Sequence, residues 1–154
     1  MFRSLLPAFV TALGCVSALP LNSPAPTFTL ADGKGQPWKL ANHLRRERLL
    51  ILAAPSAADL DETVRQTGLL YDRDLRVVAL VAPGDAALKR SPSLMLTVLS
   101  DPGGRVSARS GRAVLIGKDR SVKASYASFP SLNAVLGLID TMPMRQQEQR
   151  TRGR

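Results

Sequence analysis

Ser56 and Asp59 are the residues of this 154-residue chain whose types and spacing best suit a site, because they follow a continuous apolar run. A serine three residues before an acid can cap a helix: its hydroxyl accepts a backbone N–H, and the carboxylate faces the positive end of the helix dipole. A nucleophilic serine would also need an activating base. The sole histidine, His43, lies in an amphipathic stretch before the apolar run, where we expect an exposed helical residue. We therefore interpret Ser56 as a helix cap.

Two further groupings resemble sites only superficially. Asp59, Asp61 and Glu62 cluster at the expected start of a helix, where the helix dipole explains them. A single histidine with scattered carboxylates does not make a zinc site. The run from Gly111 to Lys118 is one residue longer than a P-loop, and Asp119 stands where a serine or threonine should hold magnesium. We expect neither a metal nor another cofactor.

The N-terminal segment is typical of an export signal. Arg3 gives a short positive region, an apolar run extends to Leu13, and residues 16–18 are small enough for cleavage. The apolar run is shorter than the roughly 20 residues that span a bilayer. Residues 1–18 are therefore predicted to be a signal peptide, which implies a periplasmic or secreted protein.

Cys15, the only cysteine, lies inside this segment. Residues 11–15 resemble a bacterial lipobox, in which the cysteine is lipidated and becomes the mature N-terminus. Lipidation at Cys15, giving a membrane-anchored lipoprotein, and ordinary signal peptidase cleavage both remain open. In either case the folded domain has no thiol for chemistry and no intramolecular disulfide.

The chain is strongly basic, with a formal net charge of +9. Residues 144–154 carry four arginines and one glutamate, and they are predicted to form a basic disordered tail. The charge fits a solvated basic surface, or attraction to anionic lipid, envelope polysaccharide or an acidic partner. Only 5% of the residues are aromatic, which argues against stacking on the bases of nucleic acid.

The hydrophobic pattern predicts one α/β domain over residues 27–143, after a proline-rich linker at 19–26. Short apolar or alternating runs indicate strands, and apolar residues at helical spacing indicate helices. Leu60, Val64, Thr67 and Tyr71 mark the buried face of the first helix, and Pro143 ends the last. The pattern predicts a hairpin over 27–40, strands at 49–54, 77–82, 94–99, 113–116 and 122–126, and helices at 58–71 and 132–142. This order gives a sandwich with a central mixed β-sheet flanked by helices.

Several runs carry a resemblance to known families. Ala25 to Leu30 and Leu99 to Val106 resemble peroxiredoxin-like proteins of the thioredoxin-like superfamily. Residues 44–148 resemble the family known as domain of unknown function 4174. The runs that carry this resemblance are Leu49–Ser56, Leu115–Asp119 with Val122 and Lys123, and Ile139–Gln146. That family is bacterial and often exported, and related domains occur in animal extracellular sushi-repeat proteins.

The resemblance implies a thioredoxin-like fold without its redox residues. Thioredoxin-like enzymes place a nucleophilic cysteine after the first central strand, which corresponds to positions near Ala57 and Leu60 here. Their cis-proline corresponds to Gly111 and Arg112, where this chain has no proline. Thiol exchange requires a thiolate, so the sequence argues against thiol redox activity.

We therefore expect a non-catalytic binding module of the cell envelope. Its ligand face would comprise Ser56, Ala57, Asp59, Gly111 and Arg112, because helix N-termini accept anions. The partner would be a protein or an anionic envelope ligand but not nucleic acid, with membrane contact only through a lipid on the leader cysteine. The alternative is a degenerate peroxiredoxin-like enzyme, or an enzyme of unidentified chemistry.

Overall fold

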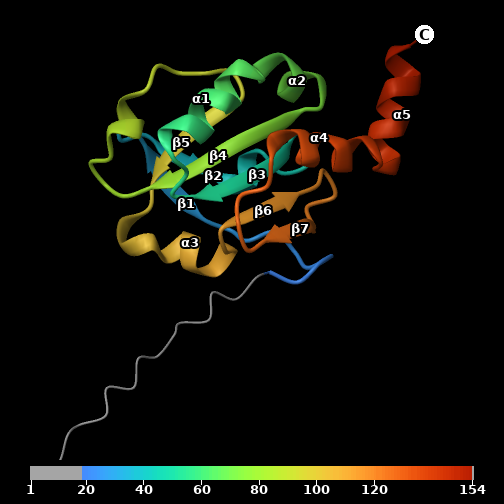
Figure 1. Cartoon of the computed structure of the whole chain (residues 1–154). Coiled ribbons are helices and arrows are strands. Elements are labelled where there is room, and N and C mark those ends of the chain that lie inside the picture. The colour runs from blue at the N-terminus through green and yellow to red at the C-terminus, as the bar shows by residue number, and fades with distance from the viewer. Residues whose placement is uncertain (1–18, 154) are drawn as a thin grey trace, which may run out of the picture.

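A seven-stranded mixed sheet forms the centre of the protein. The structure, a computed structural model, describes residues 19–153, so the predicted signal peptide and lipobox lie outside the described residues. Across the sheet the strands follow the order β2-β1-β5-β4-β3-β6-β7 (Figure 1). Their bounds are β1 Thr29–Asp32, β2 Pro37–Lys39, β3 Arg48–Ala53, β4 Leu75–Val81, β5 Leu96–Ser100, β6 Ala113–Ile116 and β7 Val122–Tyr126. The predicted α/β class and mixed sheet are confirmed.

The middle of the sheet is parallel and its flanks are antiparallel. Strand β4 pairs in parallel with both β3 and β5, while β6 pairs antiparallel with β3 and β7. All six residues of β3 are buried, as expected for a strand covered on both faces. Leu50 and Leu52 belong to one core cluster, and Leu49 and Ile51 belong to the other. One apolar run thus supplies both halves of the core.

Helices cover both faces of the sheet (Figure 1). Helices α1 (Ala57–Arg65), α2 (Thr67–Asp72) and α4 (Leu132–Asp140) lie on what we call the α1 face. Helix α3 (Arg105–Ser110) and the 3-10 turn η1 (Leu40–Asn42) lie on the opposite α3 face. Short 3-10 turns also occur at η2 (Ala86–Lys89) and η3 (Pro102–Gly104). Among the described residues, no helix is long and apolar enough to cross a bilayer.

The predicted single helix over residues 58–71 is interrupted. Gln66 has a non-helical ψ of 15°, and the chain restarts as α2 at Thr67. The predicted buried face was partly wrong: within α1 the buried positions are Leu60 and Thr63, and the break can alter the orientation only of residues that follow it, such as Tyr71. Leu60 is buried as expected, but Val64 and Tyr71 are 43% and 60% exposed.

The predicted disordered tail was also wrong. Pro143 does not end the chain's last helix but occupies the first turn of a further one, α5 (Pro143–Arg152), a position that needs no backbone N–H. The side chain of Arg145 is only 3% exposed. Residues 143–152 are therefore part of the fold, held by polar contacts that hydrophobic periodicity does not register.

The proline-rich segment before β1 packs against the sheet instead of forming a free linker. Asn22 N donates to Val122 O (2.8 Å), Val122 N to Ser23 O (2.9 Å) and Ala25 N to Arg120 O (2.9 Å). Residues 19–25 therefore run along the outer edge of β7. We call this segment the strap, because it occupies backbone groups that an edge strand would otherwise expose.

Candidate functional site

The turn after β3 begins the candidate site. Ala54 takes a positive φ of 51°, and its N–H donates to Leu80 O at 2.8 Å. Ser56 then caps α1: Asp59 N donates to Ser56 Oγ (3.2 Å), while Ser56 N and Ser56 Oγ both donate to Asp59 Oδ2 (2.8 Å each). The capping interpretation of Ser56 is confirmed. Because Asp59 supplies its own carboxylate to this helix terminus, the geometry does not favour an additional anion there.

Gly111 and Arg112 lie beside this turn. Helix α3 ends at Gly111, whose φ of 77° is favourable only for glycine. The next carbonyl, Arg112 O, accepts from Ala53 N at 2.9 Å, so the segment pairs with the end of β3. The fold thus brings the two predicted halves of the site together. No peptide bond among residues 19–153 is cis.

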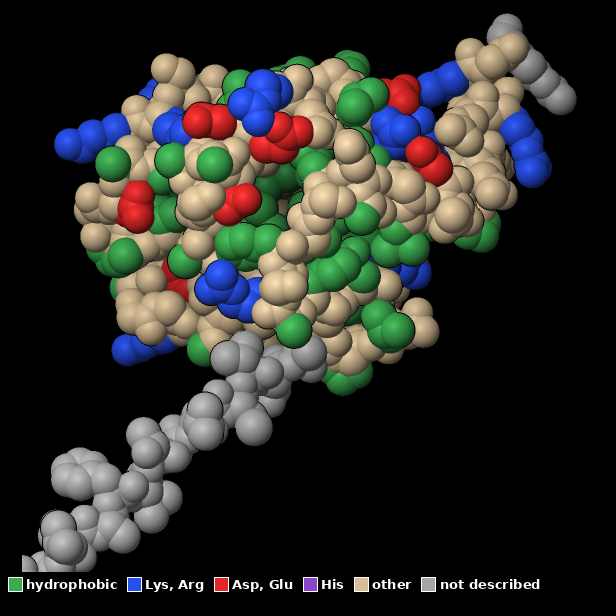
Figure 2. All heavy atoms as spheres, viewed as in Figure 1, with side chains coloured by type: hydrophobic (Ala, Val, Ile, Leu, Met, Phe, Trp, Pro, Cys, Tyr) green, Lys and Arg blue, Asp and Glu red, His purple; other side chains and the backbone are tan. Residues whose placement is uncertain are grey.

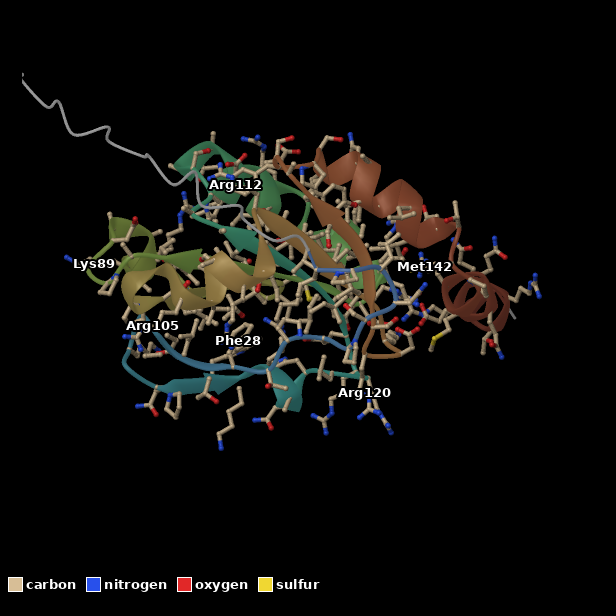
Figure 3. The ribbon with its side chains drawn as sticks, turned by 90° about the horizontal axis from the view of Figure 1, so that it is seen from below. Phe28, Lys89, Arg105, Arg112, Arg120 and Met142 are labelled. Atoms are coloured by element: carbon tan, nitrogen blue, oxygen red, sulfur yellow. The ribbon has the colours of Figure 1, made fainter. Side chains whose placement is uncertain are left out.

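Phe129 also belongs to this site, although it was not predicted from the sequence. Its ring lies beneath the guanidinium of Arg112, with Cζ 4.7 Å from the ring centroid, a cation–π distance. Figure 3 shows the exposed position of Arg112 at the margin of the fold. The sequence feature that could have indicated this residue is its position in a short Ser-Phe-Pro-Ser segment, directly before the last predicted helix.

A small cavity connects Asp59 with Phe129. It has a volume of about 260 Å³, and its residues come from strand β3, helix α1 and the loop that enters α4: Leu50, Leu52, Asp59, Glu62, Thr63, Gln66 and Phe129 to Asn133. In Figure 2 this side of the molecule is hollowed, with hydrophobic side chains inside and acidic ones around it. The cavity therefore combines an apolar floor with an acidic wall.

The acidic lining distinguishes this cavity from others on a basic protein. Its only charged residues are Asp59 and Glu62. Three further cavities are lined by more basic than acidic residues, including one of about 590 Å³ with Lys34, Lys89 and Arg90. Hydrogen bonds from Arg65 and then Gln66 hold the pKa of Glu62 below its usual value. Glu62 is therefore ionised at neutral pH; Arg65 already pairs with it in an exposed contact, which a cation in the cavity would share or displace.

His43 is remote from Ser56 and does not activate it. The two residues flank β3 at opposite ends, and a six-residue strand spans roughly 20 Å. His43 is half-buried after η1, stacked on Trp38 with ring centroids 4.5 Å apart, and its Nδ1 lies 3.0 Å from Glu47 Oε2. It is not the exposed helical residue that the sequence predicted.

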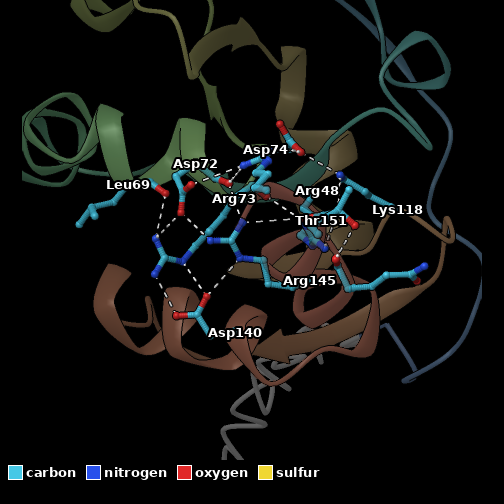
Figure 4. A network of polar contacts seen from close by, with 12 residues as sticks. Arg48, Leu69, Asp72, Arg73, Asp74, Lys118, Asp140, Arg145 and Thr151 are labelled. Carbon is cyan, nitrogen blue, oxygen red and sulfur yellow. Dashed lines mark hydrogen bonds and ion pairs between the residues drawn. The ribbon is translucent and has the colours of Figure 1, made fainter. Parts of the chain in front are cut away.

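A second polar cluster lies at the other end of the molecule and holds α5 (Figure 4). Buried Arg145 contacts Asp72 and donates to its backbone O, and Arg48, 1% exposed, donates to Glu148 at 3.3 Å. We call this cluster the α5 clasp; its members are Arg48, Asp72, Arg73, Asp74, Lys118, Asp140, Arg145 and Glu148. Lys118, Asp140 and Arg145, which belong to the distinctive sequence runs, therefore stabilise the fold.

No metal centre emerges from these arrangements. Among residues 19–153, no group of three or more His, Cys, Asp or Glu side chains is placed to hold a metal ion. The candidate site consequently consists of a cap, a cation–π pair and a small acidic cavity.

The fold is similar to those of thioredoxin-like and peroxiredoxin proteins of known structure. Similar solved structures include the mitochondrial 2-Cys peroxiredoxin of Plasmodium falciparum (TM-score 0.62, 13% identity, covering 79% of this chain and 93% of that one). A peroxiredoxin-like protein of Aquifex aeolicus has a TM-score of 0.62 at 16% identity, covering 80% and 88%. Peroxiredoxin 6 of Arenicola marina has a TM-score of 0.67 at 14% identity, covering 84% and 76%.

At the level of sequence, the chain belongs to the family described as domain of unknown function (DUF4174), whose model matches residues 39–148. The predicted family is thereby confirmed. No curated protein is similar in sequence to this chain. At these low identities the solved structures establish the fold and leave the activity to be argued from the residues.

Proposed function

We propose that the protein is an exported, non-catalytic thioredoxin-like module that binds a partner protein through the acidic cavity beside α1. The binding surface comprises Ser56 to Asp59, Glu62, Arg112 and Phe129, and the cavity receives a lysine or arginine side chain of the partner. The observation that carries the proposal is the cavity lining, which is apolar and acidic on an otherwise basic protein.

The size of the cavity supports a side chain over a free small molecule. Small-molecule pockets usually have volumes of roughly 300–1,000 Å³, and this cavity has about 260 Å³. A lysine or arginine has an apolar stem and a charged head. Its stem would contact Leu52 and Phe129 while its head pairs with Glu62.

The roles of the other residues follow from their contacts. Ser56 and Asp59 fix the first turn of α1 through the capping box, which holds the acidic wall in place. Arg112 covers one face of Phe129 and restricts the ring. The surface therefore requires no thiol, which agrees with a chain whose only cysteine is Cys15.

The protein's export rests on the leader sequence and the family resemblance. If it is exported, the processed protein should be recovered from the periplasm or the medium. Mass spectrometry of its N-terminus distinguishes a diacylated Cys15 from a start at Leu19. Recovery of an unprocessed chain from the cytoplasm would contradict this part of the proposal.

Site-specific photocrosslinking in cells tests the binding surface. A photoreactive residue at Asn133, which is exposed and lines the cavity, should capture a discrete partner. Peptide mapping should place the crosslink next to a partner lysine or arginine. The same probe at Gln147, exposed on α5, is the position control.

A pair of isosteric variants tests the charge. Glu62→Gln should reduce the Asn133 crosslink about tenfold, because a charge-assisted hydrogen bond contributes about 1.5–3 kcal/mol. Asp61→Asn removes the same charge from the same helix but does not line the cavity, so it should leave the crosslink unchanged. Equal crosslinks from both probe positions, or no effect of Glu62→Gln, would contradict the proposal.

A further inference from the structure

The α3 face carries exposed arginines without carboxylate partners. Arg105 and Arg109 lie on α3, Arg45 and Arg46 follow η1, and Arg120 lies in the β6–β7 turn; all five are exposed. None of them pairs with an acidic side chain of the described residues. Figure 3, drawn from the α3 side, labels Arg105 and Arg120 at separate margins of this face.

Acidic residues on this side are engaged in contacts of their own. Asp101 is buried and accepts hydrogen bonds from the first residues of α3. Glu47 pairs with Arg76 at 2.8 Å, and Asp119 pairs with Lys123. The five arginines are therefore uncompensated by their neighbours, and their charge is directed to solvent.

The strap joins this same face. Leu19 packs against the α3-side core, and its O accepts from Ser125 Oγ at 2.7 Å. The strap then runs to Ala25, whose N–H donates to Arg120 O. The chain thus enters the fold on the basic side. A residue at position 15 lies at most about 14 Å of extended chain from Leu19, so an anchor there would hold this face near a membrane.

We propose that the α3 face docks electrostatically on anionic phospholipid, with Arg45, Arg46, Arg105, Arg109 and Arg120 contacting lipid phosphates. Guanidinium groups pair with phosphate oxygens in bidentate geometry. Their distribution over three separate segments suits an extended surface better than a single bound anion. This contact is independent of the acidic cavity and needs no lipid on Cys15.

Vesicle sedimentation tests the proposal with the chain starting at Leu19, which lacks both the apolar leader and Cys15, so that neither a signal peptide nor an acyl group contributes. The probes are vesicles of phosphatidylcholine alone and vesicles containing 30% phosphatidylglycerol, both in roughly 50 mM salt. Binding to the anionic vesicles should exceed binding to the neutral ones at least tenfold. It should weaken strongly at about 0.5 M salt, where charges are screened beyond a few ångströms.

Three double variants separate the face from the net charge. Arg45→Gln with Arg46→Gln, and Arg105→Gln with Arg109→Gln, should each reduce the partition coefficient roughly tenfold or more, since one basic residue near an anionic surface contributes about a fivefold factor. Arg65→Gln with Arg150→Gln removes the same charge from helices α1 and α5, and it should reduce binding less than twofold. Circular dichroism verifies that each variant is folded.

Equal losses from all three double variants would show that only net charge matters, and equal binding to neutral and anionic vesicles would show no role for lipid phosphate. Either result overturns the proposal, as does an absence of binding at low salt. Crosslinking at the acidic cavity is read separately, so failure of the lipid contact leaves the partner-binding proposal intact, and the reverse also holds.

Discussion

The helices on the two faces of the sheet carry opposite charges. On the α1 face, α1, α2 and α4 hold five carboxylates and one arginine. On the α3 face, α3 holds two arginines and no acid, and two more arginines follow η1. Several carboxylates of the first face are paired with basic side chains, as in the α5 clasp, whereas the arginines of the second are not. The paired charges of the α5 clasp therefore contribute to folding, whereas the unpaired arginines of the α3 face are available for the proposed lipid contact.

The largest expected effect comes from the clasp. Glu148→Gln leaves the guanidinium of Arg48, which is 1% exposed, without its carboxylate. Removing one partner of a buried pair costs about 3–5 kcal/mol. Glu148 is itself 20% exposed, so we expect a loss near the lower limit, about 3 kcal/mol. Urea titration measures this loss in the free energy of unfolding. Glu62→Gln, in an exposed pair, is the control and should change stability little. A small effect of Glu148→Gln would show that the clasp contributes no more to the free energy of unfolding than a surface ion pair does.

The clasp also predicts a dependence of stability on pH. Arg73 lowers the pKa of Asp140 through hydrogen bonds. Burial raises the pKa of Glu148, but the hydrogen bonds and charges of Lys118 and Arg48 together lower it more. Both acids therefore stabilise the fold above their unfolded pKa values of about 4, and this contribution is lost as the pH falls through the lower folded values.

Urea unfolding between pH 2.5 and 7 measures this dependence. The free energy of unfolding should be nearly constant above about pH 5 and should fall below about pH 4. Asp140→Asn should reduce the slope in the acid range. A wild-type profile that stays flat down to pH 2.5 would show that the clasp carboxylates contribute no net stability.

An intermediate effect should come from Asp101, a buried acid beneath the α3 face. Asp101 accepts from Val106 N (3.1 Å), Ser107 N (2.9 Å) and Ser107 Oγ (2.7 Å). Asp101→Ala should destabilise the protein by about 1–2 kcal/mol, the usual loss for a helix cap, in thermal or urea unfolding. Asp101→Asn keeps an acceptor and should lose less. Equal losses would show that the charge itself is required.

The smallest expected effect concerns the unpaired arginines. Arg105→Gln combined with Arg109→Gln should change the free energy of unfolding by no more than about 0.5 kcal/mol, as for most exposed substitutions. The same urea titrations provide the measurement. A substantial loss would mean that these charges have partners within the fold, and it would remove the distinction between the two faces.

The sequence predicted the strands well because each carries its own hydrophobic signal. The run from Leu49 to Ala54 and the hairpin from Ala113 to Tyr126 need no distant partner to be recognised. Helix α3 was missed because Arg105 to Ser110 has little apolar content. Helix α5 was called disordered because buried Arg145 is stabilised by Asp72, more than 70 positions earlier in the chain.

The candidate site was predicted only in part. The capping of α1 is local and could be predicted from Ser56 and Asp59. The fold resemblance predicted that Gly111 and Arg112 lie close to the turn after β3. The hydrogen bond from the end of β3 to Arg112 O agrees with this prediction. Phe129 and the acidic cavity depend on how the loop before α4 packs against α1, which no local pattern specifies. The charge of the cavity in turn favours a cation where the sequence suggested an anion.

The strap has a consequence for self-association. Without residues 19–25, the outer edge of β7 would present free backbone donors and acceptors, because Val122 N and Val122 O both pair with the strap. A fragment limited to residues 39–148 would also lack β1, which pairs with β5, and would expose that edge as well. Open strand edges template pairing with other chains. Such a fragment should aggregate, and the seven residues from Leu19 to Ala25 therefore protect part of the sheet edge from pairing with other chains.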